Sequence, residues 1–204
     1  MVSTPAFESY VSPRTVFNLS AIDPATGQSP GSGLASTIYN VDGGSWTSSP
    51  LEFSLSAVQG RRLIEYQSSD RLGNLEVIRS TAVSLDAEPP LTSISLGLPR
   101  FDAEDGRVFL STHSLLTLSA RDYPEGAAAG VRQTDYSWDG STFATILNPV
   151  PAGQEGNRSV YFRSWDNVLN DETISSITFI VDGTGPSITG VGPAGGEAFI
   201  ARRE

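Results

Sequence analysis

The sequence predicts an all-β protein made of two similar domains in tandem, and two observations carry this prediction. The first is an internal repeat at an offset of 96 residues, as from Gly60 to Gly156, which indicates an array of like units. The second is that apolar residues alternate with period two, while no long segment carries a helical stripe. The repeated residues are Gly60, Tyr66, Ser68, Asp70, Asn74, Glu76, Asp86 and Pro90, which recur as Gly156, Phe162, Ser164, Asp166, Asn170, Glu172, Asp182 and Pro186.

Alternating apolar residues predict the strands of each unit in turn. In the segment 15–21, Phe17, Leu19 and Ala21 fall on one face of a strand, because successive side chains of a strand point to opposite faces. Gly43 and Gly140 mark turns, since glycine adopts the positive φ that tight hairpin turns require. The clearest strands cover residues 15–21, 63–68 and 81–85 in the first unit, with counterparts around 116–120, 160–162 and 177–181 in the second.

Each unit has about seven short strands in roughly 95 residues, which is typical of an Ig-like β-sandwich. The sequence therefore predicts two tandem Ig-like β-sandwich domains, at residues 1–87 and 88–184. The second domain is expected to contain an insertion at 99–111, in which a turn near Gly106 is followed by a returning strand. Residues 185–204 are expected to begin a third repeat or to form a tail.

Composition and charge limit the classes of function. The chain has no cysteine, so no disulfide can stabilise the units, and its formal net charge of −10 argues against nucleic acid as a ligand. No stretch is apolar enough to cross a bilayer, and residues 1–5 do not resemble a signal peptide. We expect part of a longer exported chain, located outside the cell or on a bacterial cell surface, without direct membrane insertion.

Three segments of the first unit resemble the tandem bacterial Ig-like (cadherin-like) extracellular repeats of large surface or secreted proteins. They read YNVDGGSW (39–46), YQSSDRLGNLE (66–76) and LDAEPP (85–90). The second unit departs from this pattern at WDNVLN (165–170), which lacks the glycine before the asparagine. The resemblance implies a spacer, an adhesin stalk or a module attached to a secreted hydrolase, with neighbouring repeats of the same chain as partners.

Acidic residues at repeated positions are the best candidates for a site. In an Ig-like sandwich, the loop after the second strand and the loop before the last strand lie at the end where the linker enters. Carboxylates gathered there repel one another unless a cation neutralises them, and Ca²⁺ accepts six to eight oxygen ligands from irregular loops. The predicted calcium ligands at the joint are Asp86, Asp122, Glu125, Asp166 and Asn170, and the weaker set in the first unit is Asp23, Asp70 and Asn74.

A second interpretation of the same residues needs no metal. Asp and Asn side chains in turns commonly accept hydrogen bonds from nearby backbone N–H groups. No segment has the dense acidic spacing of a dedicated calcium loop. The sequence leaves turn capping and calcium binding open as alternatives.

Aromatic residues are a second set of candidates for a ligand surface. Trp46, Tyr123 and Trp165 are predicted near turns or loops, where exposed rings stack on sugars, although packing in the core is the more frequent use of such residues. Catalysis has no support, because the chain has one histidine, no cysteine and no nucleophile motif. The predicted function is a non-catalytic spacer or stalk. The alternatives are a module that binds a glycan or a host cell-surface protein, and an accessory domain of a secreted hydrolase.

Overall fold

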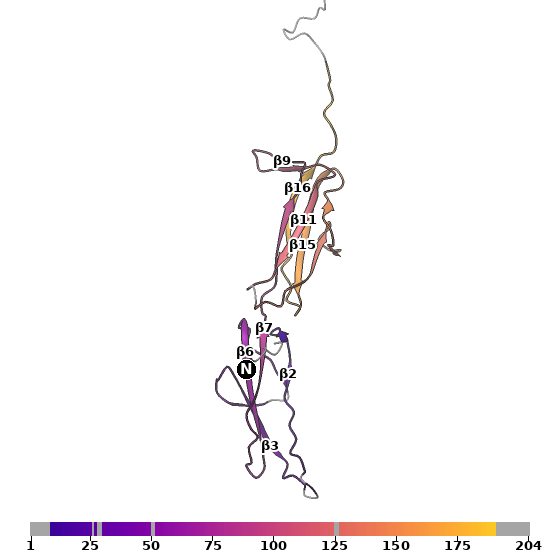
Figure 1. The fold of residues 1–204 in the computed structure, drawn as a ribbon. Helices are drawn as coiled ribbons and strands as arrows, with labels where there is room; N and C mark the ends of the chain where they lie inside the picture. Colours follow the sequence, from indigo (N-terminus) through magenta and orange to yellow (C-terminus); the bar gives the residue numbers. More distant parts are fainter. Residues whose placement is uncertain (1–8, 26, 28–29, 50–51, 125–126, 191–204) are drawn as a thin grey trace, which may run out of the picture.

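The computed structural model describes residues 9–25, 27, 30–49, 52–124 and 127–190, and every regular element in this part of the chain is a β-strand. Strands β1–β7 pair with one another, and β8–β16 do likewise, so that two β domains follow one another along a common long axis (Figure 1). The predicted all-β fold of two tandem Ig-like β-sandwiches is confirmed. Among the described residues, no helix has the length and hydrophobicity needed to cross a membrane.

The first domain packs a five-stranded sheet against a two-stranded one. Val11, Ile64, Val83 and Leu85 of the larger sheet form the core together with Leu55. The larger sheet has the order β1 (Ser9–Val11), β7 (Arg79–Leu85), β6 (Gly60–Asp70), β3 (Leu34–Val41) and β4 (Thr47–Ser48). The smaller sheet pairs β2 (Phe17–Asn18) with β5 (Glu52–Phe53).

The second domain has the same plan with longer strands. Leu116 of the smaller sheet packs against Val160 and Phe179 of the larger one in the core. The larger sheet has the order β13 (Ala144–Thr145), β12 (Val131–Ser137), β15 (Gly156–Asp166), β16 (Ser175–Val181), β10 (Val108–Leu110) and β9 (Arg100–Asp102). The smaller sheet has the order β14 (Val150–Pro151), β11 (Leu115–Arg121) and β8 (Leu91–Leu96).

Strand pairing repeats from one domain to the other. Gly60 pairs with Leu85 in the first domain, and Gly156 pairs with Val181 in the second. Strand β1 runs parallel to β7 as β10 runs parallel to β16, so β10 is the counterpart of β1. The expected insertion at 99–111 is therefore narrower than predicted. Its part without a counterpart among the described residues is β9, which forms a hairpin with β10.

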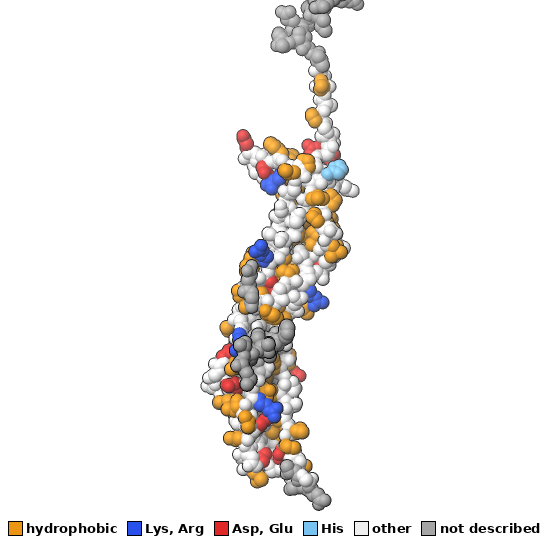
Figure 2. Space-filling model, in the orientation of Figure 1, with side chains coloured by type: hydrophobic (Ala, Val, Ile, Leu, Met, Phe, Trp, Pro, Cys, Tyr) orange, Lys and Arg blue, Asp and Glu red, His pale blue; other side chains and the backbone are white. Residues whose placement is uncertain are grey.

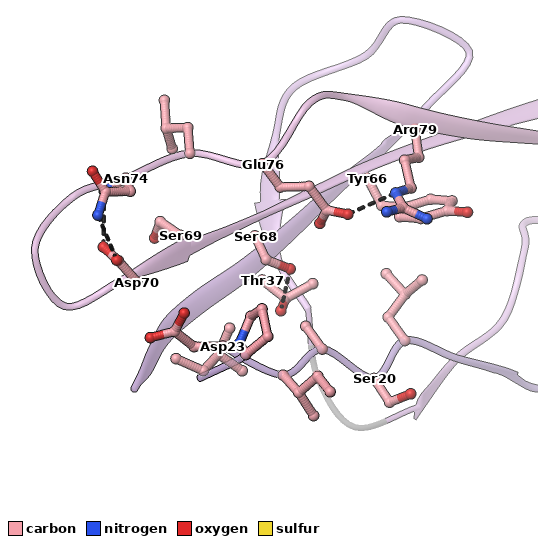
Figure 3. Close-up of a pocket in the computed structure, with 16 residues that line it drawn as sticks. Ser20, Asp23, Thr37, Tyr66, Ser68, Ser69, Asp70, Asn74, Glu76 and Arg79 are labelled. Carbon is pink, nitrogen blue, oxygen red and sulfur yellow. Dashed lines mark hydrogen bonds and ion pairs between the residues drawn. The ribbon is translucent and has the colours of Figure 1, made fainter. Parts of the chain in front are cut away.

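The two domains differ at the edge of the smaller sheet. Strand β11 pairs with β8 over six residues, whereas β2 is only two residues long. The sequence predicted a strand over 15–21, which is too long. Residues 19–24 have no strand beside them on this edge among the described residues, and a groove lies there instead (Figure 3). Alternation of apolar residues marks which side chains face inward, but a strand also needs a neighbour to pair with.

Charged side chains are thinly spread over the surface. On the face shown in Figure 2, outside the grey residues, arginines lie singly and form no continuous basic patch.

Candidate metal centre at the domain joint

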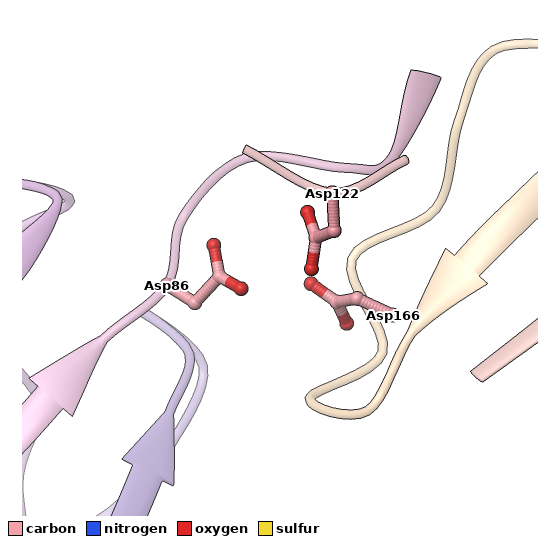
Figure 4. A group of neighbouring side chains, drawn as sticks. All are labelled: Asp86, Asp122 and Asp166. Carbon is pink, nitrogen blue, oxygen red and sulfur yellow. The ribbon is translucent and has the colours of Figure 1, made fainter. Parts of the chain in front are cut away.

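Three carboxylates converge where the second domain follows the first. Asp86 comes directly after β7, Asp122 directly after β11, and Asp166 ends β15. One oxygen atom from each side chain lies within 4.8 Å of the others, and Figure 4 shows the three groups turned toward one another. We call these three residues the joint cluster. The structure thus brings together three of the five residues that the sequence proposed for this site as metal ligands.

Asp86 is completely buried and bonded to both domains. Its Oδ1 accepts a hydrogen bond from Gln59 Nε2 of the first domain at 3.0 Å, and its Oδ2 accepts one from the Ala129 amide of the second at 2.6 Å. Its own amide donates to the Val11 carbonyl at 2.8 Å, which continues the β1–β7 pairing into the linker. The carboxylate is therefore part of the connection between the domains.

Asp166 organises the loop that follows β15. Its Oδ1 accepts hydrogen bonds from the amides of Val168 at 2.9 Å and Asn170 at 2.8 Å. The Asn170 side-chain nitrogen donates to Asp166 Oδ2 at 2.7 Å and to the Asp86 carbonyl at 3.0 Å. The Asn170 side-chain nitrogen therefore ties the loop to the linker, and metal binding by this residue stays a prediction.

Asp122 is the least buried of the joint cluster. Its Oδ1 accepts from the Tyr123 amide at 3.0 Å, and its Oδ2 accepts from the Gly130 amide at 2.7 Å. Burial raises the pKa of Asp122, and the neighbouring charge of Asp86 and then that of Asp166 raise it further. The site therefore holds negative charge at an energetic cost, which a bound cation would relieve.

The joint cluster has the geometry of a site for a hard divalent cation. Two oxygens on one Ca²⁺ lie at most about 5 Å apart, because each Ca–O distance is about 2.3–2.6 Å, and the cluster's 4.8 Å spread falls within that limit. A carboxylate oxygen that accepts one N–H bond still has a second lone pair for a cation. Arginine ion pairs found among the described residues involve other carboxylates, such as Asp42 with Arg62. The N–H bonds also fit the turn-capping alternative.

The first domain repeats the same loops, and its described residues gather no third carboxylate beside them. Asp23 Oδ2 accepts from the Gly33 amide at 2.8 Å, as Asp122 does from Gly130. Asp70 Oδ1 accepts from the Asn74 amide at 2.8 Å and Oδ2 from its side chain at 2.7 Å. These bonds lower the pKa of Asp70, the Asn74 side chain being the largest cause. A turn of this kind therefore favours the charged carboxylate. The two charges that help to raise the pKa of Asp122, those of Asp86 and Asp166, both belong to the joint.

The three candidate aromatic side chains do not join the cluster or one another. Trp46 follows the turn after β3 and is 41% exposed, and Tyr123 lies in the loop after β11. Trp165 lies in β15, where the Arg163 guanidinium sits 4.5 Å from its ring centroid. Glu125 lies outside the described residues. These placements give no shared aromatic surface among the three candidate rings.

Sequence reasoning missed Gln59 and Ala129, which hold Asp86 from either side. Ala129 acts through its backbone amide, for which a sequence carries no signal. Gln59 had one available signal, because it precedes the repeated Gly60 as Glu155 precedes Gly156. Gln59 Oε1 accepts from the Ala87 amide at 2.7 Å, and Glu155 Oε1 accepts from that of Gly183 at 3.0 Å.

Comparisons with known proteins add little to this geometry. No protein-family model matches the chain, and no curated protein is similar to it in sequence. Among solved structures, the chain is similar to the fibronectin(III)-like modules of Clostridium thermocellum CbhA, with 14% sequence identity and a TM-score of 0.39. That match covers 89% of this chain and 93% of the other. The class of protein is defined by the fold itself, which is a tandem of Ig-like β-sandwiches.

Proposed function

We propose that this chain is a non-catalytic spacer or stalk segment of an exported bacterial protein, in which Ca²⁺ stiffens the joint between tandem Ig-like domains. The observation that carries the proposal is the position of Asp86. This linker carboxylate is fully buried, bonded to both domains and directed at two further carboxylates of the second domain. A freely jointed linker would leave such a side chain in solvent.

Further contacts support a joint of fixed geometry. Arg14 of the first domain donates to the Leu169 carbonyl of the second at 3.3 Å, and its side chain lies 3.5 Å from the Asp171 carboxylate. Both partners of this ion pair are largely exposed, so the pair itself contributes little to stability. Pro89 and Pro90 restrict the linker backbone to extended conformations. The cation is proposed to add stiffness to a joint that is already ordered.

Calcium is proposed in preference to magnesium on coordination grounds. The joint cluster offers irregular loop oxygens, and Ca²⁺ tolerates variable geometry, whereas Mg²⁺ requires a near-ideal octahedron at shorter distances. Extracellular calcium modules typically bind with dissociation constants of roughly 10⁻⁴–10⁻³ M. We expect the joint cluster to bind in that range, in accord with the proposed location outside the cell.

Direct recognition of a glycan or a host cell-surface protein ranks second. Exposure of Trp46 and Tyr123 favours it, but these residues belong to different domains, and Trp165 is covered on one side by Arg163. An accessory role in a secreted hydrolase would use the same joint and is compatible with the spacer proposal.

The proposal is tested by measuring the distribution of distances between the two domains. The chain has no cysteine, so a Val77→Cys, Leu147→Cys variant carries one spin label on each domain, at positions 81% and 86% exposed. We expect a narrower distance distribution in millimolar CaCl₂ than in EDTA or MgCl₂ at equal ionic strength. The same experiment with Asp86→Asn should lose the narrowing. Identical distributions in all three buffers would refute a calcium-stiffened joint.

A further inference from the structure

We propose that a pocket across the domain joint binds an acidic saccharide, that is, a glycan with a pyranose ring that carries a carboxylate. The pocket has a volume of about 410 Å³, which lies in the usual range of small-molecule sites. The inference rests on the proposed function in one respect, since the pocket keeps its shape only while the joint is fixed. This joint pocket is lined by Arg14 of the first domain and by Arg132, Gln133, Trp165, Leu169 and Asp171 of the second.

Trp165 supplies a flat aromatic surface that is already held in place. The Arg163 guanidinium carbon lies 4.5 Å from the centroid of the Trp165 ring and 4.4 Å from that of the Phe143 ring. Arg163 does not line the joint pocket, so the pocket meets Trp165 on a side that Arg163 leaves open. A ring fixed in this way loses little freedom when a ligand stacks on it.

The polar groups of the joint pocket include both donors and acceptors of hydrogen bonds. Arg14 Nη1 donates to the Leu169 carbonyl at 3.3 Å, and its Nη2 lies 3.5 Å from Asp171 Oδ1. The side chains of Arg14 and Asp171 are 72% and 54% exposed, so both are open to a ligand. The Gln133 amide nitrogen donates to Asp135 at 2.8 Å, which leaves the amide oxygen as an acceptor. A ligand here must both donate and accept, as sugar hydroxyls do.

The charge of the joint pocket is opposite in sign to that of the chain. Two arginines and one aspartate line the pocket, whereas the whole chain has a formal net charge of −10. Arg132 is exposed, and within the described part of the chain its side chain forms no ion pair. A carboxylate on the ligand would pair with Arg132, because a planar guanidinium binds a carboxylate through two parallel hydrogen bonds.

The internal repeat shows that the fold itself does not require these side chains. An isolated β-bridge joins Trp165 to Asp171 in the second domain, and the equivalent bridge joins Ser69 to Leu75 in the first. The first domain therefore forms the same backbone contact with neither the aromatic ring nor the carboxylate. The side chains of the second domain are available for another use.

Strand pairing beside the bridge leads to the same conclusion. Gln133 lies opposite Trp165 in the second domain, as Ser36 lies opposite Ser69 in the first. The two serine hydroxyls are 2.8 Å apart and satisfy each other. Small groups thus cover this surface in the first domain, whereas the second domain carries large polar and aromatic groups around a hollow. Their chemistry serves the joint pocket.

An acidic saccharide matches these groups better than a polyanion does. The face of an aromatic ring is negative, so it attracts the partly positive C–H groups on the face of a pyranose. A nucleic acid or an acidic peptide would bring further negative charges against Asp171, and like charges in contact are costly. A single carboxylate for Arg132, set among neutral hydroxyls for Asp171 and Gln133, avoids this cost.

The ligand would contact both domains, because Arg14 belongs to the first and the other lining residues to the second. Calcium at the joint cluster and a saccharide in the joint pocket would then favour the same arrangement of the domains. Coupling between two sites is reciprocal, so each ligand should tighten the binding of the other by the same factor. The joint would act as a point of recognition in addition to a stiff connection.

Nuclear magnetic resonance of the indole N–H groups tests the joint pocket. The chain has three tryptophans, so three such signals are expected. We expect 3′-sialyllactose or a hyaluronan tetrasaccharide to shift the Trp165 signal with a dissociation constant of about 1 mM, as the usual binding energy per atom gives for one sugar ring. The stronger of the two identifies the carboxylate as that of a sialic or a uronic acid. Lactose should bind about tenfold more weakly, because it lacks the charged hydrogen bonds.

Arg132→Gln should reduce the affinity for the acidic saccharide to that for lactose. It should leave folding unchanged, because the Arg132 side chain is exposed. Arg107→Gln is the matched control, since Arg107 is 61% exposed and belongs to the hairpin of β9 and β10, away from the joint (Figure 1). An unshifted Trp165 signal at about 10 mM of either acidic saccharide, ten times the expected dissociation constant, overturns the proposal. Equal binding of lactose overturns it as well, and so does an unchanged affinity of Arg132→Gln.

The titration is made in EDTA and repeated in CaCl₂, which separates this proposal from the proposed function. The Arg14 contacts form without metal, so binding in EDTA supports the joint pocket by itself. Equal binding in both buffers would keep the pocket and count against a calcium-stiffened joint. Absence of binding in both would overturn the pocket and leave the joint to the distance measurement between the domains.

Discussion

Replacing Asp86 by asparagine separates the calcium-binding and turn-capping interpretations of the joint. The change removes one negative charge from the cluster but keeps the size and shape of the side chain. Without calcium we expect a loss of about 1 kcal/mol, because the asparagine amide presents a donor to either Gln59 or Ala129, both of which donate to Asp86. Relief of the repulsion that raises the pKa of Asp122 partly offsets this loss.

With calcium the two chains should differ much more. For a dissociation constant of roughly 10⁻⁴–10⁻³ M, about 10–100 mM CaCl₂ supplies the ion at 100 times that constant, which stabilises the folded state by about 2.7 kcal/mol. For a domain of about 100 residues this corresponds to a rise in Tm of about 10–20 °C. We expect the wild-type chain to show this rise and Asp86→Asn to show less than a third of it. Thermal unfolding followed by circular dichroism, in EDTA and in CaCl₂ at equal ionic strength, measures both.

Asp182→Asn is the matched control for this experiment. Asp182 occupies the same place after β16 as Asp86 after β7, but it is exposed, and within the described part of the chain it belongs to no group of three carboxylates. Its variant should keep the full calcium response at concentrations where the chain is monomeric. An equal response of the wild-type and Asp86→Asn chains would refute the reasoning, and so would a wild-type chain indifferent to calcium.

Three further predictions follow from the comparison of the two domains. Asn170→Ala should lower the free energy of unfolding by about 2 kcal/mol, since the Asn170 side-chain amide donates to the Asp86 carbonyl and to the Asp166 carboxylate. Asn74→Ala should cost about half of that, because Asn74 bonds only Asp70 in an exposed turn. Urea unfolding measures both losses. Glu172→Gln should cost about 2 kcal/mol, because the buried Glu172 carboxylate accepts hydrogen bonds from the amides of Thr92 in β8 and Ser164 in β15. Glu76→Gln should change stability by no more than about 0.5 kcal/mol, because Glu76 forms only an exposed pair with Arg79; equal costs in urea unfolding would contradict this difference. The raised pKa of Asp122 means that its negative charge destabilises the calcium-free fold. As pH falls through that raised pKa toward the ordinary value near 4, the wild type should therefore gain stability relative to Asp122→Asn. The rise in Tm caused by calcium should shrink over the same pH window, and parallel Tm scans of the two chains measure both effects.

The sequence was sufficient to predict the fold and the convergence of Asp86, Asp122 and Asp166. Both predictions depend on topology, because equivalent loops of a β-sandwich meet at the same end whatever their exact conformation. It was not sufficient for the role of Asn170, since the direction of an amide depends on which acceptors surround it. Nor did it reveal that Ala129 binds Asp86, because every residue except proline has a backbone N–H.

The length of β2 shows a different limit. Leu19 and Ala21 alternate with polar residues just as Leu118 and Ala120 do, and inward-facing residues were identified correctly in both domains. Only the second pair belongs to a regular strand, because β8 lies beside it. A strand forms only where two chain segments pair. The alternation of apolar residues in one segment therefore overestimates the length of a strand wherever no second segment lies beside it.

The parallel pairs β1–β7 and β10–β16 determine how each domain would respond to tension. In each pair the chain enters the domain ahead of the first strand and leaves it after the second, and the two strands run in the same direction. A pull on the two ends therefore slides one strand along the other and loads all of their hydrogen bonds at once, instead of opening them one after another. A chain of such domains under flow or traction would resist rupture through strand geometry alone, with no cysteine needed to lock it.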